Sequence, residues 1–155
     1  MSAARTLAVF VGNLLVGDDA VGCAVHDRLA GAPPVDGLRL EALGVGGLRL
    51  LDLLEGEALL VLVDAVQLGH PPGTVHVIPW EALPAPVTAT TSHGVGLREA
   101  MEVGRRLFPE RMPGRAVLVG VEGRAFDVLG SPMTPAVATA VERAAATVLE
   151  LAAQA

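Results

Sequence analysis

Lysine and tyrosine are absent from this chain, which has only one tryptophan and three phenylalanines among its 155 residues. Its formal net charge is −6. Proteins that bind nucleic acid need a basic surface, and many also need aromatic side chains that stack on bases. We therefore expect no nucleic-acid partner.

The chain also has little cysteine and no long hydrophobic run. Cys23 is the only cysteine, which excludes an internal disulfide and fits a reducing cytoplasm. The longest uninterrupted hydrophobic run, Ala58–Val63, is far shorter than the roughly 20 residues that span a bilayer. Asn13, Asp18 and Asp19 follow the first apolar stretch without a small-residue cleavage site, which argues against a signal peptide. We expect a cytoplasmic protein with no membrane segment.

What the chain does contain is apolar: 52% of its residues are hydrophobic and 18% are charged. This balance is typical of a parallel sheet covered by helices on both faces, so we expect one α/β domain over residues 1–155. Strands are predicted at Leu7–Val11, Leu38–Leu43, Leu59–Val63, Thr74–Ile78 and Ala116–Val121. The second is expected near a sheet edge, the third is expected to end at Asp64, and the fourth is expected to be a hairpin-type addition antiparallel to its predecessor.

The most informative stretch is Val11–Gly22, a predicted turn from the first strand into a helix. Its glycines permit close backbone approaches, and Asp18 and Asp19 arrive where the helix begins. A carboxylate at a helix N-terminus can simply cap the helix, which is one interpretation of Asp18. The other interpretation, favoured for Asp19, is a ligand.

Polar residues also follow other predicted strands and loops. Asp64 ends the third strand, and His93 precedes a helix. Two carboxylates and an imidazole at one sheet edge would form a three-ligand site with open positions, suited to zinc or nickel. Taken singly, Asp64 could turn the chain and His93 could be an exposed turn residue; their shared position, together with that of Asp19, favours the metal site.

Other sites receive less support. The glycines after the first strand could cradle a phosphate, but the two aspartates would repel an anion and no G-x-G-x-x-G or Walker pattern is present. Cys23 could be a nucleophile with His26 as its base, although Cys23 is predicted to face the core. His26 is also a minor alternative ligand on the helical face of Asp19. His70 and His76 are predicted to be surface residues.

Several segments resemble the [NiFe]-hydrogenase maturation endopeptidase family. They are Gly12–Gly22 (G-N-L-L-V-G-D-D-A-V-G), Val63–Val66, Pro72–Val75, Ser92–Gly94 and Gly120–Glu122. The opening segment and V-D-A are fairly specific together, whereas S-H-G and G-V-E are weak singly.

The resemblance implies a single-domain three-layer sandwich, with helices on both faces of a five-stranded, mostly parallel sheet. It implies an endopeptidase that removes a short C-terminal extension from the large-subunit precursor of a hydrogenase after nickel insertion. The family's metal-contacting positions fall on Asp19, Asp64 and His93. Nickel would be carried by the substrate, and zinc or cadmium could occupy the site in vitro.

One segment departs from the family pattern. Members commonly have Asp-Gly-Gly-Thr-x-Gly after the second strand, associated with substrate recognition, whereas this chain has Ala42–Gly47, A-L-G-V-G-G. We assign substrate binding to Gly44, Val45 and Gly46, and the departure leaves the identity of the precursor open. An alternative function is a non-enzymatic checkpoint or binding module that uses the same metal site without cutting.

Overall fold

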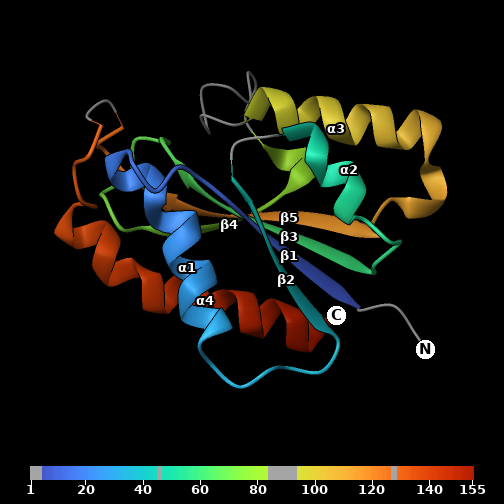
Figure 1. Cartoon of the computed structure of the whole chain (residues 1–155), viewed down its shortest axis with the longest axis horizontal. Helices are drawn as coiled ribbons and strands as arrows, with labels where there is room; N and C mark the ends of the chain where they lie inside the picture. The colour runs from blue at the N-terminus through green and yellow to red at the C-terminus, as the bar shows by residue number, and fades with distance from the viewer. Residues whose placement is uncertain (1–4, 45–46, 84–93, 127–128) are drawn as a thin grey trace.

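The computed structural model describes residues 5–44, 47–83, 94–126 and 129–155. Its centre is a five-stranded sheet in the order β2-β1-β3-β5-β4 (Figure 1). The strands are β1 (Thr6–Val11), β2 (Leu38–Gly44), β3 (Leu59–Val66), β4 (Val75–Pro79) and β5 (Arg115–Glu122). All neighbouring pairs are parallel except β4 with β5. The predicted mostly parallel five-stranded sheet is therefore confirmed.

Helices cover both faces of the sheet, which gives the three layers that were predicted (Figure 1). The helices are α1 (Val21–Ala30), α2 (Leu50–Leu53), α3 (Gly94–Leu107) and α4 (Pro135–Gln154), with short 3-10 turns η1 (Gly17–Ala20), η2 (Gly47–Arg49), η3 (Trp80–Ala82) and η5 (Pro109–Arg111). One buried cluster joins α1 and α4 to the sheet, and a second joins α2 and α3 to the opposite face. Alternate residues of β1, such as Phe10 and Val9, supply the two clusters.

The central strand β3 is buried along its whole length, as its continuous apolar run predicts. It does not end at Asp64, however, because Ala65 and Val66 continue the ladder against Val121 and Glu122 of β5. The predicted strand end was therefore two residues early. Asp64 lies inside a strand and does not turn the chain.

The outer strands show one success and one error of the sequence prediction. β2 lies at the sheet edge, as expected from its alternation of apolar and charged residues. β4 was predicted as a hairpin-type addition antiparallel to its predecessor. The direction is confirmed, because β4 is antiparallel to β5 and β5 is parallel to β3. The hairpin is wrong, because β5 lies between β3 and β4. Within the described ranges, no helix combines the length and the apolar character needed to cross a membrane.

Candidate functional site

The two predicted carboxylate ligands lie where the parallel strands β1 and β3 reach their carboxyl ends. Asp64 is fully buried near the end of β3, where its Oδ1 accepts the N–H of Ala65 at 2.8 Å. Asp19 lies in η1, between β1 and α1, and is 6% exposed. Its Oδ2 accepts the N–H of Asn13 at 3.1 Å. Both carboxylates are therefore oriented by backbone amides.

Two glycines let the start of α1 approach the strand ends closely. A Cβ on Gly12 would lie 2.3 Å from the carbonyl oxygen of Asp19, and a Cβ on Gly22 would lie 2.1 Å from the carbonyl oxygen of Val11. The same Cβ on Gly22 would be 3.0 Å from the carbonyl oxygen of Val63, the residue before Asp64. These contacts leave no room for a side chain, so glycine is required for η1 and α1 to pack against both β1 and β3.

Cys23 lies in the first turn of α1, next to the backbone of Gly12. Burial raises the pKa of its thiol, and the negative charges of Asp27, Asp19 and Asp64 raise it further. The thiol lies 3.8 Å from the carbonyl oxygen of Gly12 as a weak hydrogen-bond donor. A thiol held in its protonated form is a poor nucleophile, so the arrangement does not favour a Cys23 nucleophile.

A cavity of about 370 Å³ opens next to Cys23. It is lined by Gly12, Asn13, Leu14, Cys23, Ala42 and Gly44, so it lies between the ends of β1 and β2 and the first turns of α1. Asn13 belongs to this wall and also holds the carboxylate of Asp19. The cavity therefore adjoins the site through Asn13, and Gly44, one of the predicted substrate-binding residues, is part of its lining.

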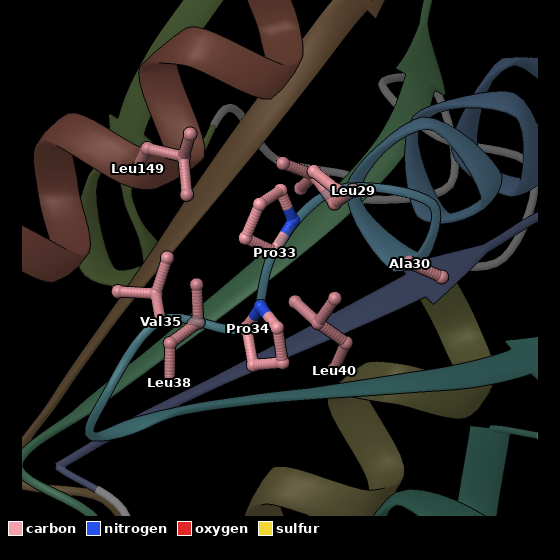
Figure 2. Close-up of a pocket in the computed structure, with 9 residues that line it drawn as sticks. Leu29, Ala30, Pro33, Pro34, Val35, Leu38, Leu40 and Leu149 are labelled. Carbon is pink, nitrogen blue, oxygen red and sulfur yellow. The ribbon is translucent and has the colours of Figure 1, made fainter.

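A second cavity, of about 230 Å³, lies at the other end of the strands, where the parallel strands begin. Figure 2 shows apolar side chains from α1, the loop after it, β2 and α4 gathered around it, among them Leu29, Pro33, Leu38 and Leu149. It has no titratable side chain in its lining and is remote from Asp19 and Asp64 in the sheet. We assign no catalytic role to it.

Three residues of the predicted site, His93, Val45 and Gly46, lie outside the described residues. Within the described part of the chain, no three His, Cys, Asp or Glu side chains form a group that could hold a metal ion. The described residues thus bring two of the three predicted ligands to one edge of the sheet. The assignment of His93 stays a prediction.

Asp18 has a different environment from the one predicted. It is fully buried, and α1 has Ala20 at its N-cap with no side-chain cap, so the interpretation of Asp18 as the cap of α1 is wrong. Its Oδ2 accepts the N–H groups of Arg124 and Ala125 at 2.8 and 3.0 Å, and its Oδ1 accepts the N–H of Thr134 at 2.7 Å and the Thr134 hydroxyl at 3.0 Å. Burial raises the pKa of Asp18, but these hydrogen bonds outweigh it and hold the pKa below its ordinary value.

Two of the remaining histidines have specific partners. His26 packs edge-on against Phe10, with ring centroids 5.3 Å apart, and its Nδ1 lies 3.2 Å from Asp27. His76, predicted at the surface, is largely buried and lies 3.0 Å from the buried Glu122. The alternation of β4 could not reveal this pair, because Glu122 comes from the neighbouring strand β5.

The model of the hydrogenase maturation protease family matches residues 34–151. The chain is 30% identical to the hydrogenase expression/formation protein HupD of Rhodobacter capsulatus, over 92% of this chain and 68% of that protein. It is also 30% identical to the hydrogenase 2 maturation protease of Escherichia coli, over 94% of this chain and 88% of that protein.

The fold agrees with these similarities. The solved structure of the hydrogenase maturating endopeptidase HybD from Escherichia coli matches with a TM-score of 0.84 and 27% identity, over 97% of this chain and 93% of that one. The expected α/β protease fold is therefore confirmed. The chain belongs to the hydrogenase maturation protease family, a family of hydrolases that cleave the C-terminal extension of the hydrogenase large subunit.

Proposed function

We propose that Asp19, Asp64 and His93 bind nickel that the large-subunit precursor of a [NiFe]-hydrogenase carries, and that this contact places the precursor's C-terminal extension for cleavage. The observation that supports the proposal most is the approach of two buried carboxylates, from η1 and β3, beside a cavity at the end of β2. Carboxylate oxygens and an imidazole nitrogen suit nickel, and they would also accept zinc or cadmium in vitro.

Each carboxylate has a defined orientation in this proposal. The N–H of Asn13 holds Asp19 and the N–H of Ala65 holds Asp64, so both are directed before the precursor arrives. Such preorganisation lowers the cost of positioning the reacting bond. The nickel of the precursor supplies a positive charge that can polarise the scissile carbonyl or a water molecule.

The extension would lie against the segment Gly44, Val45 and Gly46. Gly44 has a φ of +69° and lines the cavity, and small residues there leave room for the backbone of a bound peptide. The single half-buried Cys23 fits a compartment in which thiols stay reduced. We therefore place the reaction in the cytoplasm.

The test is to incubate the purified protein with nickel-loaded and nickel-free precursor and to measure the precursor mass. The wild type should remove the extension only from the nickel-loaded form. Asp19→Asn and Asp64→Asn keep the side-chain shape but lose the charge, and each should slow cleavage by about 100-fold or more. Asp19→Glu should keep measurable activity, and Asp36→Asn, at an exposed carboxylate, is the matched control.

The possible outcomes separate the assignments. If Asp19→Asn cleaves normally while a folded Asp18→Asn does not, the roles of the two aspartates are reversed. If the precursor stays intact under all conditions, the chain acts as a checkpoint that binds without cutting. The names of its relatives, which are maturation proteases, do not favour that alternative.

A further inference from the structure

Three exposed leucines lie on and next to the loop that precedes Asp19, and one of them, Leu14, lines the cavity. Leu14 is 66% exposed, Leu15 is 60% exposed and Leu129 is 74% exposed. Single exposed leucines are common on protein surfaces and need no explanation. Here two are consecutive in one loop, and the third is brought next to them from a distant part of the chain. We call these three residues the leucine rim.

The leucine rim is held in place by backbone hydrogen bonds between two loops. The N–H of Gly130 donates to the carbonyl of Leu15 at 2.6 Å, and Val16 and Leu129 form an antiparallel bridge. The N–H of Gly17 donates to the carbonyl of Ser131 at 3.1 Å. The leucines are therefore presented on a bonded framework.

Beneath this framework, Asp18 ties the same region to the rest of the domain. Its N–H donates to the carbonyl of Ala125 at 2.8 Å, and its carboxylate accepts from Arg124, Ala125 and Thr134. The loops after β5 and before α4 are thus joined to the turn that presents Leu14 and Leu15. Because the backbone that carries these exposed leucines is already ordered, it loses no further conformational entropy when a partner covers them.

The leucine rim is also joined to the proposed catalytic site through Asn13. The N–H of Asn13 donates to the carboxylate of Asp19 at 3.1 Å, and its side-chain oxygen accepts the N–H of Leu15 at 2.9 Å. Leu14 lines the cavity itself. A protein that delivers a peptide to Asp19 through this cavity therefore passes next to Leu14 and Leu15.

We propose that the leucine rim is the docking surface for the folded body of the large-subunit precursor, and that it takes an apolar patch next to the base of the C-terminal extension. This inference rests on the proposed function, because that function makes a protein the molecule that reaches Asp19. A second copy of this chain is the less favoured occupant, because a copy seated on the leucine rim would block the cavity that the extension has to enter.

The test measures binding separately from cleavage. Nickel-loaded precursor is immobilised, and its Kd is measured for the wild type and for the double variant Leu15→Ser/Leu129→Ser, which leaves the cavity-lining Leu14 unchanged. We expect the Kd to rise by about tenfold or more, because buried apolar anchors dominate binding at such interfaces. Leu107→Ser is the matched control: Leu107 is also 66% exposed, but it lies at the end of α3, at the opposite edge of the sheet. The Kd of Leu107→Ser should stay within about twofold of the wild-type value. All variants should melt at the wild-type temperature, because the exposed leucines that they replace contribute little to the core.

The results distinguish this inference from the proposed function. A wild-type Kd for the double variant, or no measurable binding by the wild type, overturns the docking role. Sedimentation gives a second check. If the wild type is a dimer, and the double variant abolishes the dimer without changing the precursor Kd, the leucine rim serves self-association and the inference is overturned. If the wild type binds through the leucine rim yet cleaves nothing, the proposed function fails and the docking inference stands.

Discussion

Removing the carboxylate of Asp18 should destabilise the protein more than the loss of an ordinary helix cap. In Asp18→Ala, three partly buried backbone N–H groups, those of Arg124, Ala125 and Thr134, lose the charged acceptor that the buried Asp18 supplies. A hydrogen bond to a charged group contributes about 1.5–3 kcal/mol, so a simple sum would be about 5–9 kcal/mol. Burying the carboxylate itself costs several kcal/mol, which the alanine avoids. We therefore expect the free energy of unfolding to fall by about 3–5 kcal/mol.

Asp18→Asn should be nearly as harmful, because donors face both carboxylate oxygens: Arg124 and Ala125 donate to Oδ2, and Thr134 donates to Oδ1. The asparagine side chain has one acceptor oxygen and one NH₂ group, and the NH₂ group cannot accept a hydrogen bond from the donors that it faces. The measurement is urea unfolding followed by circular dichroism, with thermal melting as a check. At about 2–4 °C per kcal/mol for a domain of this size, the melting temperature should fall by about 6–20 °C.

The pH dependence supplies an independent test. The folded protein holds the pKa of Asp18 below the value of about 3.9 expected in the unfolded chain. The stabilisation is therefore complete above the unfolded pKa and is lost as the pH falls through the lower, folded pKa. The stability difference between the wild type and Asp18→Ala should shrink below about pH 4. Asp36→Ala, at an exposed carboxylate, is the control. A loss below about 0.5 kcal/mol, like that of a neutral surface substitution, would refute the reasoning.

Three further predictions concern the site. Gly22→Ala should lower the free energy of unfolding by about 3 kcal/mol or more, because the new Cβ would lie 2.1 Å from a backbone oxygen. In the same unfolding assay Gly31→Ala should be neutral or slightly stabilising, because the nearest atom to its Cβ is 3.4 Å away. Alkylation of Cys23 in metal-free protein should be slow at neutral pH. Asp19→Asn should speed the reaction about two- to tenfold, because loss of the negative charge lowers the pKa of the thiol. An unchanged rate would contradict an effect of the Asp19 charge on Cys23. Zinc and cadmium affinity, measured by titration, should weaken as the pH falls through the range where histidine protonates, and His93→Ala should lower the affinity at neutral pH; equal affinity would remove His93 from the site.

Much of the fold could be predicted because its signals are local. The apolar run Leu59–Val63 indicates a strand buried on both faces, and the alternation of Leu38–Leu43 indicates an edge strand; both are confirmed in β3 and β2. The turn Val11–Gly22 could be located from its glycines and aspartates. The prediction of where Asp64 stands in its strand was wrong, because the length of β3 depends on how far β5 pairs with it.

The amino-acid pattern alone also brought Asp19 and Asp64 to one edge of the sheet, since the carboxyl ends of parallel strands meet there. The role of Asp18 could not be found in the same way. The backbone N–H groups that donate to Asp18 lie 106 to 116 residues further along the chain, and no spacing rule connects them with it. The same limit applies to the pair of His76 with Glu122 and to the meeting of Leu15 with Gly130.

The sequence by itself thus determined the fold class, the family and the edge of the sheet at which two carboxylates meet, because strand periodicity and turn composition act over a few residues. Only the tertiary structure showed what surrounds Asp18. That environment depends on the connection between β5 and α4, whose Arg124, Ala125 and Thr134 donate N–H groups to the buried Asp18, whereas the N–H that Asp19 accepts comes from Asn13, which lines the cavity. Hydrogen-bond partners of a buried charge are set by long-range packing, so they follow from the assembled fold and not from the neighbours in the chain.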